Sequence, residues 1–396
     1  MKLLLVHNHY RQPGGEDEVF LRESALLLSA GHEVLEYTTH NNEIAEDGVF
    51  GKAKLAARTL WAWDSVAGLR SLVQRERPCL AHFHNTFPLI SPAAYYACQH
   101  EGIPVVQSLH NARLMCPAAT LYRKGSACHD CAGRSVAWPG VVRACYHNSR
   151  IQTAVVAGML SGHRILGTWQ QKVDAYIAFT EFYRQKFITA GLPREKIFLK
   201  PHFLGIDPGM KQIAGDYALF LGRLAPEKGV PTMLKAWRSL SHVPLRIRGE
   251  GPLGSDVEQF TRENSSVSTL PYLSRRECFD LIKGARFLVW PSEGYYESFG
   301  LVAIEAFACG TPVIASRTGA MAEIVEDRKT GLHFTAGDAD DLAAKAHWAW
   351  THPEEMRELA NGARAEYEAK YAAERNYHLL IEIYNRCLNR GMRKAA

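Results

Sequence analysis

Two glutamates, Glu297 and Glu305, flank seven residues that join a predicted strand to a predicted helix. The apolar run 287–290, closed by Pro and Ser, predicts a buried strand. The segment 301–309 lacks Gly and Pro and is followed by Gly310, which predicts a helix that ends there. Glu297 therefore precedes the helix, and Glu305 lies one turn inside it.

The loop before this helix has the chemistry of an anion site. The N–H groups of about Phe299, Gly300 and Leu301 lie at the positive end of the helix, where a phosphate binds well. One of the two carboxylates, Glu297 or Glu305, can then contact whatever is attached to the phosphate on one side. The other carboxylate can accept hydrogen bonds from hydroxyl groups on the opposite side.

A second loop supplies cationic partners. The strand-like segment 217–221 leads into Gly222-Arg223-Leu224-Ala225-Pro226-Glu227-Lys228-Gly229, and a helix is expected from about Val230. The planar fork of Arg223 and the compact charge of Lys228 suit a diphosphate. Each cation alone is more often a solvated charge in a turn. The position of the pair, about 70 residues before the acidic helix start, favours the interpretation that both cations bind a diphosphate.

This order of motifs resembles the retaining glycosyltransferases of family 4, and the resemblance covers nearly the whole chain. The motifs that carry it are Gly222-Arg223-Leu224 with Lys228-Gly229, Gly249-Glu250-Gly251-Pro252, Pro291-Ser292, Glu297-Ser298-Phe299-Gly300-Leu301 with Glu305-Ala306, and Gly310-Thr311-Pro312-Val313-Ile314-Ala315-Ser316. The resemblance implies that Arg223 and Lys228 bind the donor diphosphate. It also implies that Glu297 faces the donor sugar and that Glu305 holds the ribose hydroxyls.

The fold that the resemblance implies is α/β of the GT-B type, with two Rossmann-like doubly wound domains facing a central cleft. A chain of 396 residues exceeds the size of one ordinary core, and strands alternate with helices in both halves. We expect an acceptor-binding domain at 1–200 with a Cys-rich insert at 116–145, a donor-binding domain at 201–371, and a helix at 372–396 that crosses back to the first domain. The first domain has predicted strands at 2–8, 32–38, 79–84, 104–109, 175–179 and 197–200 and predicted helices at 16–30, 52–77, 92–100, 151–172 and 181–190.

Further candidates follow the strands of the first domain. Gly14 and Gly15 open a helix after the first strand, either as a plain tight turn or as the family's Gly-Gly loop near the donor phosphate and the acceptor. The resemblance assigns a functional role near the donor sugar and phosphates to His110, where a single His would otherwise more often be structural. Family members often have Asp next, but this chain has Asn111. Three residues after the third strand are expected on the acceptor side, namely His82, His84 and Asn85.

The expected mechanism needs neither a covalent nucleophile nor a metal ion. Glu297 and Glu305 straddle the donor, unlike the paired carboxyl groups of retaining hydrolases. The resemblance implies that the leaving diphosphate accepts the proton of the acceptor while the same sugar face is attacked, with Arg223 and Lys228 stabilising its charge. The one Asp-x-Asp string, at 338–340, is expected to cap a helix.

Four cysteines of the insert have metal-ligand spacing. Cys116, Cys128, Cys131 and Cys145 are separated by eleven, two and thirteen residues. Four thiolates in this order suit a closed tetrahedral zinc site with a structural role. Unligated thiols, a disulfide or an iron–sulfur cluster are the alternatives, and two histidines of the insert region are less favoured ligands, His129 and His147. Some family 4 enzymes of bacterial polysaccharide synthesis share such an insert.

Positive charge is concentrated in residues 51–200, where 19 Lys and Arg face 7 Asp and Glu, a difference of +12. With the tryptophans at 61, 63, 138 and 169, this surface suits contact with anionic lipid, for example through Arg70, Arg75 and Arg77. The alternative is solvated arginine with tryptophans in the core. No motif accompanies the charge to indicate nucleic acid. Scattered cysteines and the lack of a long apolar run predict a cytoplasmic protein. If the basic surface contacts lipid, the protein is expected at the inner face of the membrane.

Taken together, the sequence predicts a retaining glycosyltransferase. It would move a hexose-type sugar from a UDP- or GDP-sugar to a saccharide or lipid-linked saccharide, in cell-surface polysaccharide synthesis. A nucleotide-sugar epimerase or hydrolase of similar fold is one alternative, which a product assay with and without acceptor separates. A noncatalytic sugar-binding module is the other, and the presence of all four diphosphate and sugar residues disfavours it.

Overall fold

The computed structural model describes residues 1–12, 14–44, 48–210, 215–295 and 297–395, and the chain divides into two compact units. The first unit contains residues 1–120, 129–200 and 376–396. The second contains residues 121–128 and 201–375. The main division falls between Lys200 and Pro201. The sequence did not predict that residues 121–128, inside the Cys-rich insert, group with the second unit.

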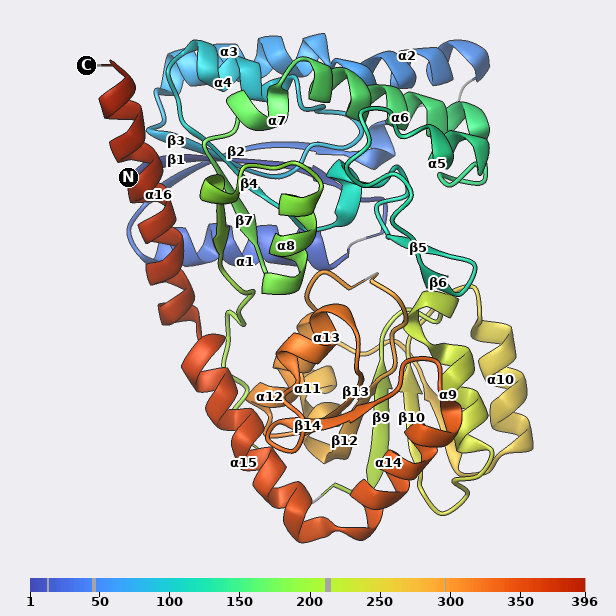
Figure 1. Cartoon of the computed structure of the whole chain (residues 1–396). Helices are drawn as coiled ribbons and strands as arrows, with labels where there is room; N and C mark the ends of the chain where they lie inside the picture. The colour runs from blue at the N-terminus through green and yellow to red at the C-terminus, as the bar shows by residue number, and fades with distance from the viewer. Residues whose placement is uncertain (13, 45–47, 211–214, 296, 396) are drawn as a thin grey trace. The chain divides into compact units, whose positions relative to one another are not determined.

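Within the described residues, the first unit has a six-stranded parallel sheet in the order β2-β1-β3-β4-β7-β8 (Figure 1). Its strands are β1 (Lys2–His9), β2 (Glu33–His40), β3 (Leu80–Asn85), β4 (Val105–Ser108), β7 (Ala175–Ala178) and β8 (Ile197–Leu199). Its helices are α1 (Gly15–Ser29), η1 (Asn41–Glu43), α2 (Gly48–Leu60), α3 (Trp63–Glu76), α4 (Ala94–His100), η2 (Ala112–Leu114), α5 (Trp138–Val142), α6 (Arg150–Ile165), α7 (Thr168–Gln171), α8 (Glu181–Thr189), η3 (Arg194–Lys196) and most of α16 (Ala373–Ala395). The central strands β1 and β3 are buried nearly throughout, as strands covered on both faces must be.

Two predicted helices of the first unit are each broken in the structure. The segment 52–77 forms α2 and α3, because the chain turns at Trp61 and Ala62, whose backbone N–H donates to Oγ of Ser91 at 2.9 Å. The segment 151–172 forms α6 and α7, which are separated at Gly167 with φ of 65°. A tertiary hydrogen bond and a left-handed glycine therefore override a helical pattern that is continuous in the sequence.

The second unit has its own six-stranded parallel sheet, in the order β11-β10-β9-β12-β13-β14 within the described residues. Its strands are β9 (Tyr217–Leu221), β10 (Leu245–Arg248), β11 (Val267–Leu270), β12 (Ala285–Trp290), β13 (Val313–Ser316) and β14 (Gly331–Phe334). Its helices are η4 (Pro226–Lys228), α9 (Val230–Trp237), α10 (Gly254–Glu263), α11 (Arg275–Gly284), α12 (Leu301–Ala308), α13 (Gly319–Ile324), α14 (Ala339–Thr351) and α15 (Pro353–Lys370). This strand order is that of the dinucleotide-binding Rossmann fold.

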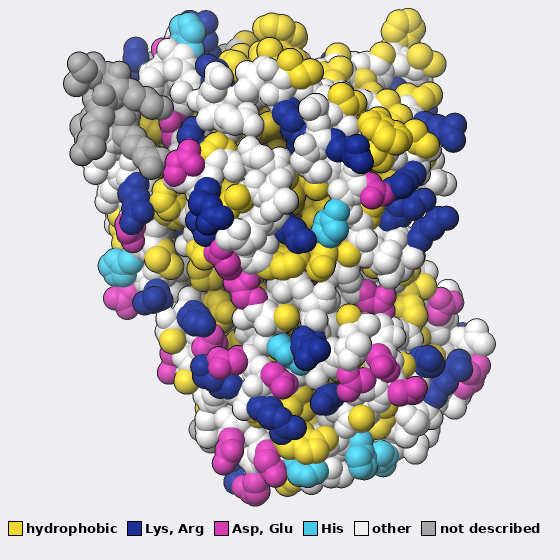
Figure 2. All heavy atoms as spheres, viewed as in Figure 1, with side chains coloured by type: hydrophobic (Ala, Val, Ile, Leu, Met, Phe, Trp, Pro, Cys, Tyr) yellow, Lys and Arg dark blue, Asp and Glu magenta, His cyan; other side chains and the backbone are white. Residues whose placement is uncertain are grey.

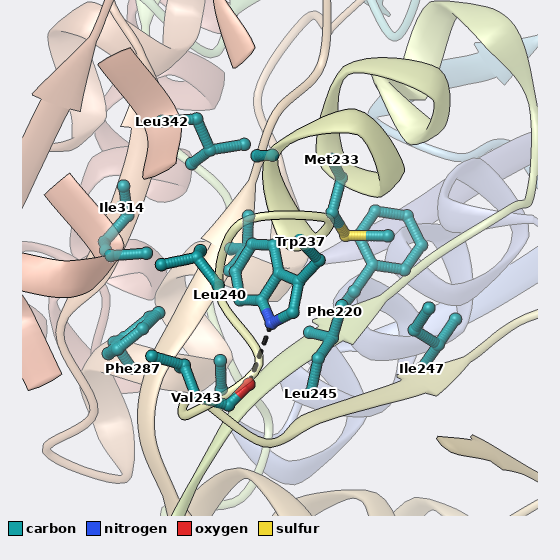
Figure 3. Close-up of a cluster of buried hydrophobic side chains, with 14 of the residues drawn as sticks. Phe220, Met233, Trp237, Leu240, Val243, Leu245, Ile247, Phe287, Ile314 and Leu342 are labelled. Carbon is teal, nitrogen blue, oxygen red and sulfur yellow. Dashed lines mark hydrogen bonds between the residues drawn. The ribbon is translucent and has the colours of Figure 1, made fainter. Parts of the chain in front are cut away.

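The core of the second unit forms where helices α9 and α14 cover the sheet (Figure 3). Trp237 is the largest side chain in this cluster, and its indole N–H donates to the carbonyl of Val243 at 3.0 Å. Met233, at helical spacing from Trp237, packs on the same face of α9. The burial of this face fixes α9 on the sheet, and with it the loop that precedes the helix.

Parallel sheets of this kind bind ligands where the strand order reverses. In the second unit the reversal lies between β9 and β12. The loop after β9 carries Arg223 and Lys228, and the loop after β12 carries Glu297. In the first unit the reversal lies between β1 and β3, whose ends carry His9 and Asn85. The topology thus places predicted site residues at the switch point of each sheet.

A short hairpin of the insert, β5 (Tyr122–Arg123) and β6 (Ser126–Ala127), belongs to the second unit. Its Tyr122 ring lies against Gly294, where an added Cβ would come within 2.7 Å of the ring. The hairpin therefore packs beside the loop that leads to Glu297. Among the described helices, none combines the length and the apolar character needed to cross a bilayer.

Candidate functional site

The structure brings Lys228 and Glu297 together at the switch point of the second unit. The ammonium of Lys228 donates a hydrogen bond to Oε1 of Glu297. The same oxygen accepts from the hydroxyl of Ser292 at 3.0 Å and faces the indole N–H of Trp290 at 3.5 Å. Three groups from two loops and a strand end thus hold one carboxylate oxygen.

Glu297 is 9% exposed, so its charge needs compensation. Burial raises the pKa of this carboxyl, but the charge of Lys228 and the hydrogen bonds from Lys228, Ser292 and Trp290 outweigh burial and leave the pKa below its usual value. The group is a carboxylate at neutral pH. It can accept hydrogen bonds from hydroxyl groups, and it is poorly suited to act as a general acid.

Helix α12 begins next to this carboxylate. Gly300 precedes the helix with φ of 111°, and an added Cβ there would lie 2.0 Å from the ring of Trp290. Glycine is therefore required both by the backbone conformation and by the space. Phe299 is buried, and its ring packs edge-on against His202 and Tyr371 with centroids 4.9 and 5.9 Å away. Its side chain belongs to the core, so only its backbone is available to a donor.

Of the remaining predicted donor residues, Arg223 is half exposed and donates to the carboxylate of Glu227 in the same loop. Glu305 lies one turn inside α12, as predicted, and is partly buried. Gly229, with φ of 69°, ends the loop so close to the other loop that an added Cβ would lie 1.8 Å from the carbonyl oxygen of Pro291. This contact fixes the spacing between the cationic and acidic loops.

In the first unit, the Gly-Gly segment forms the start of α1. Gly14 precedes the helix, and its N–H donates to Oδ2 of Asp17 at 2.8 Å. Oδ1 of Asp17 lies 2.9 Å from Nε2 of His7 and 3.1 Å from Nδ1 of His9. Gly15 is the first residue of α1. Pro13, which precedes this pair in the motif, lies outside the described residues. The loop is therefore tied to the end of β1 through Asp17.

Asn111 stands where family members often have Asp, and the structure gives a reason. Its side-chain amide donates to Oε1 of Glu16 at 2.6 Å, and its Oδ1 accepts from the N–H of Arg113 at 2.9 Å. Tyr10 donates to the other oxygen of Glu16 at 2.9 Å. Burial raises the pKa of Glu16, and the hydrogen bonds from Asn111 and Tyr10 offset this only in part. A carboxylate at position 111 would face another carboxylate.

His110 is buried at the end of β4, and its Nε2 lies 3.1 Å from Nδ1 of His84. His82, predicted with His84 on the acceptor side, lies between the phenol of Tyr384 at 2.8 Å and the hydroxyl of Ser108 at 2.9 Å. His82 is fully buried and therefore part of the interior rather than a lining group. Asn85 is also buried, and its amide donates to the carbonyl of Asn8 at 2.8 Å.

Sequence reasoning missed a buried ion pair behind these histidines. Glu23 of α1 and Lys200 after β8 are both fully buried, and the ammonium of Lys200 donates to Oε1 of Glu23. Lys200 also donates to Oδ1 of Asn376 in α16 at 2.8 Å. The available signal was a glutamate seven residues after Glu16, among the apolar positions of a predicted helix. The lysine before the Pro of the linker was a second signal.

The four cysteines of the insert are divided between the two units. Two groups of three or more His, Cys, Asp and Glu side chains have all ligand atoms within 4.8 Å of one another, namely His7, His9 and Asp17, and Glu23, His82 and His84. No group of described residues with this geometry contains a cysteine. Cys128 belongs to the second unit, whereas the three other cysteines of the set belong to the first.

The Asp-x-Asp string acts as predicted. Oδ1 of Asp338 accepts from the backbone N–H groups of Asp340 and Asp341 at 3.0 and 3.1 Å, at the start of α14. The string is a helix cap.

Some of the residues predicted to contact lipid are buried or paired with other side chains in the first unit. Trp169 is buried in the core, and Trp61 stacks on His163 with ring centroids 5.4 Å apart. Trp63 and Trp138 are exposed. Two of the three arginines proposed for lipid contact are paired with acids, Arg70 with Glu101 at 3.1 Å and Arg75 with Glu76 at 2.8 Å.

Comparison with known proteins identifies the family. The family model for Glycosyltransferase Family 4 matches residues 13–206, and the model for Glycosyl transferases group 1 matches residues 213–366. The two matches follow one another and together span most of the chain. The chain belongs to glycosyltransferase family 4 and has the GT-B fold, with two Rossmann-like domains.

Several curated glycosyltransferases are similar in sequence. An uncharacterized glycosyltransferase of Methanocaldococcus jannaschii is 32% identical over 185 residues, which cover 46% of this chain and 51% of that protein. The D-inositol 3-phosphate glycosyltransferase of Mycolicibacterium smegmatis is 34% identical over 182 residues, covering 43% of this chain and 40% of that protein. The chain thus spans about half the length of the first of these curated relatives and less of the second.

Solved structures share the fold at low identity. HepE from Anabaena in complex with UDP superposes with a TM-score of 0.67 at 17% identity, over 96% of this chain and 99% of that one. Sucrose-phosphate synthase from Thermosynechococcus elongatus gives a TM-score of 0.69 at 18% identity, over 97% and 98% of the two chains. At this identity the likeness establishes the fold.

Proposed function

We propose that this protein is a retaining glycosyltransferase that transfers a hexose-type sugar from a nucleotide-diphosphate sugar to a saccharide or lipid-linked saccharide. The observation that carries the proposal is the buried Glu297, held as a carboxylate by Lys228 directly before helix α12. A cation, a carboxylate and a helix N-terminus at one switch point provide the groups that a sugar linked to a diphosphate requires. Family membership supports the same conclusion.

The donor is proposed to be a UDP- or GDP-sugar. Arg223 and Lys228 would bind the diphosphate, with the N–H groups of Gly300 and Leu301, and Glu305 would accept from the ribose hydroxyls. HepE, which shares the fold, was crystallised with UDP and with UDP-glucose, and this favours UDP as the first nucleotide to test. Phe299 contributes through its backbone because its ring is buried.

In the proposed mechanism, the acceptor hydroxyl attacks the face from which the diphosphate leaves. A leaving-phosphate oxygen takes the hydroxyl proton as the new glycosidic bond forms. Arg223 and Lys228 stabilise the charge that develops on the diphosphate, and Glu297 orients the sugar through its hydroxyl groups. His110 is proposed to contact the sugar. We propose a role in cell-surface polysaccharide synthesis together with this acceptor, a saccharide or lipid-linked saccharide.

A transfer assay tests the proposal. Thermal-shift screening of UDP-, GDP- and ADP-sugars identifies the donor, because a ligand that binds only the folded state raises the melting temperature. The bound donor is then incubated with and without saccharide acceptors, and the anomeric configuration of the product is read by NMR. A product with the donor's configuration, formed only with acceptor, is expected. Sugar release or epimerisation without acceptor indicates the hydrolase or epimerase, and binding without turnover indicates a sugar-binding module.

We further propose that the first unit contacts anionic membrane surfaces. Helix α6 packs against α2 and α5. Near the starts of α2 and α6, Val49, Phe50 and Ile151 are 81%, 93% and 80% exposed. Lys52 and Arg150 are exposed beside them. Figure 2 shows hydrophobic and basic side chains gathered over this part of the first unit. Apolar groups that enter a headgroup layer, ringed by cations, are the features of an interfacial contact.

Structural zinc in the cysteine insert stays a prediction from the sequence. Elemental analysis of protein prepared without chelator is the direct check. About one zinc per chain, lost on Cys128→Ser and retained on Cys278→Ser, is expected if the insert binds the metal.

A further inference from the structure

Two histidines and an aspartate converge at the carboxyl end of β1 in the first unit. Oδ1 of Asp17 lies 2.9 Å from Nε2 of His7 and 3.1 Å from Nδ1 of His9. These two ring nitrogens and the carboxylate oxygen all lie within 4.8 Å of one another. The three residues come from one strand and from the helix that follows it, so the cluster belongs entirely to the first unit.

The local structure explains why the three side chains meet. His7 and His9 are two positions apart on β1, so their side chains project from the same face of the strand, with ring centroids 4.6 Å apart. Asp17 is the third residue of α1, and its other oxygen, Oδ2, accepts from the backbone N–H of Gly14 at 2.8 Å. The ring of His7 stacks on Phe20, one turn further along α1, with centroids 4.8 Å apart. Strand and helix therefore hold the three groups together without a ligand.

Two imidazole nitrogens and one carboxylate oxygen are the ligands of a transition-metal site. Such a set suits Zn²⁺ and Fe²⁺, whereas Mg²⁺ and Ca²⁺ prefer oxygen ligands. Ligand atoms at the usual distance from a tetrahedral zinc ion are about 3.3 Å from one another. The separations of Asp17 from His7 and His9, 2.9 and 3.1 Å, therefore need to open by only a few tenths of an ångström to admit the ion.

The surroundings suit a bound ion as well as they suit the hydrogen bonds formed without one. Ligating carboxylates are themselves hydrogen-bonded, and the N–H groups of Gly14 and Tyr10, at 2.8 and 3.3 Å, donate to Asp17. The side chain of His9 is 24% exposed, so water reaches its ring. Nδ1 of His7 is buried with no partner among the described residues. It lacks a partner whether the ring donates to Asp17 or binds an ion, so it favours neither form.

A second group of possible ligands, made of Glu23, His82 and His84, is less suitable. Oε1 of Glu23 accepts from the ammonium of Lys200, so a positive charge already lies beside this carboxylate. The side chains of all three residues are fully buried, which leaves an ion no direct access from solvent. The cluster at the end of β1 has neither obstacle, because its carboxylate faces two histidines and one of these is partly exposed.

We propose that His7, His9 and Asp17 bind a divalent transition-metal ion, Zn²⁺ or Fe²⁺. Three protein ligands leave at least one coordination position open to water. The ion joins the end of β1 to the first turn of α1, and it thereby fixes the segment Gly14-Gly15 that begins this helix. The inference goes beyond the proposed sugar transfer, does not depend on it, and assigns the ion no step in that reaction.

Cobalt binding to the full chain tests the proposal. Co²⁺ replaces Zn²⁺ at sites of this kind, and its visible absorption reports coordination by the protein. A thiolate ligand adds an intense charge-transfer band in the near ultraviolet, so Co²⁺ bound by cysteine is recognised separately. The protein is freed of metal with a chelator, the chelator is removed, and Co²⁺ is titrated. We expect about one equivalent to bind without the thiolate band and to be displaced by Zn²⁺.

Two variants each remove one ligand. His9→Gln and Asp17→Asn should weaken this Co²⁺ binding at least about tenfold, because even the loss of a group behind a ligand costs about 10- to 100-fold. His100→Gln, at the exposed end of α4 in the same unit, is the matched control and should bind as the unmodified chain does. Zn²⁺ should also raise the melting temperature of the unmodified chain and of the control more than that of either ligand variant.

A histidine pair at the surface of the second unit needs its own control. Nε2 of His242 and Nδ1 of His347 lie 2.9 Å apart, and both residues are exposed. This pair supplies two ligands, and His242→Gln removes one of them. The Co²⁺ signal should persist in His242→Gln. Its loss there would assign the ion to the surface pair and overturn the proposal.

The remaining outcomes are distinct. Equal Co²⁺ binding by the unmodified chain and by folded His9→Gln overturns the proposal, as does the lack of a signal without the thiolate band in the unmodified chain. The three residues then form a hydrogen-bond network only. If Asp17→Asn does not fold because Gly14 and the histidines lose their common acceptor, His9→Gln still decides, since His9 is partly exposed. Metal binding without sugar transfer would refute the proposed function and leave this inference standing.

Discussion

Lys228 and Glu297 form an ion pair that joins the loop after β9 to the loop after β12, across 69 residues of sequence. Both side chains are proposed to contact the donor, yet here each neutralises the other. A bound diphosphate would compete with Glu297 for the ammonium of Lys228. In the absence of a ligand, the proposed donor site therefore holds its cation in an ion pair with Glu297.

This pairing predicts opposite behaviour of two variants. Lys228→Ala should weaken binding of UDP alone by about 10- to 100-fold, since a charged hydrogen bond contributes about 1.5–3 kcal/mol. Glu297→Gln should bind UDP at least as tightly as the unmodified chain, because the competing charge is gone, while turnover falls at least tenfold. Calorimetry and initial rates measure both effects. Lys235→Ala, on the exposed side of α9, is the control, and equal losses of UDP affinity in both site variants would contradict the competition.

Gly229 is predicted to be essential to the fold of the second unit. Gly229→Ala places a Cβ 1.8 Å from the oxygen of Pro291 in a backbone conformation with φ of 69°, and should lower the free energy of unfolding by at least about 2 kcal/mol. Gly254→Ala, at the start of α10 with no atom within 4 Å of the added Cβ, should be neutral or slightly stabilising. Denaturant unfolding of the two variants makes the comparison. Similar midpoints would show that the two loops can separate freely.

Asn111→Asp tests the replacement of the family's acidic residue. The new carboxylate would face Glu16 at the distance of the present 2.6 Å hydrogen bond, and one of the two groups must take up a proton. We expect a loss of stability above pH 6 that is recovered as the pH falls. Thermal unfolding between pH 5 and 8 measures this. Asn111→Ser, which can still donate a hydrogen bond, should lack the pH dependence.

The buried histidines predict a loss of stability in mild acid. Burial lowers the pKa of His82 from 6.5 to about 4, so below pH 6.5 the unfolded chain binds a proton that the folded chain does not. Stability therefore rises with pH between about 4 and 6.5, by up to about 1.4 kcal/mol per pH unit for each such group. The depressed pKa of Glu297 acts at lower pH, because its contribution is complete above the ordinary pKa of 4.5 and is lost as the pH falls below that value.

Replacement of His82 by Gln isolates this effect. His82→Gln should reduce the slope of stability against pH between 4.5 and 6.5, as measured by denaturant titrations at several pH values. The exposed His378 of α16 supplies the control, and His378→Gln should leave the slope unchanged. An undiminished slope in His82→Gln would mean that other groups cause the acid sensitivity.

The membrane proposal predicts that exposed apolar residues, rather than the arginines of α3, control lipid binding. Phe50→Asp and Ile151→Asp should each weaken binding to vesicles containing anionic phospholipid, because each removes an apolar group and adds a negative charge. Leu28→Asp alters a residue of α1 that is 54% exposed in the same unit and should have no effect. Sedimentation with vesicles at two salt concentrations is the assay. Binding that is equal in all variants would assign the apolar surface to another partner.

The sequence predicts much of the fold because parallel strands and amphipathic helices leave strong periodic signals. The strand 217–221 and the helix that begins at Val230 occur as predicted. The loop motifs also place Glu297 and Glu305 correctly relative to α12. The breaks at Ala62 and Gly167 were not predictable, because one depends on a hydrogen bond from distant Ser91 and the other on a single left-handed residue.

The candidate site was predictable in its residue types but not in its pairings. That Lys228 meets Glu297 depends on the order of strands in the sheet, which periodicity does not encode. The ion pair between Glu23 and Lys200 joins residues 177 positions apart, and only their buried context makes them notable. Phe299 illustrates a related gap, since its motif gives its backbone position but not the direction of its ring.

The structure of the first unit has a consequence for biosynthesis. Residues 1–200 leave the ribosome long before α16, yet Lys200 and His82 depend on Asn376 and Tyr384 of that helix for hydrogen bonds. The nascent first unit therefore stays incomplete, with polar groups and apolar surface uncovered, until the second unit and α16 have been synthesised. Chaperone demand should be greatest in this interval, and a stop codon shortly before position 376 should send the chain to proteolysis.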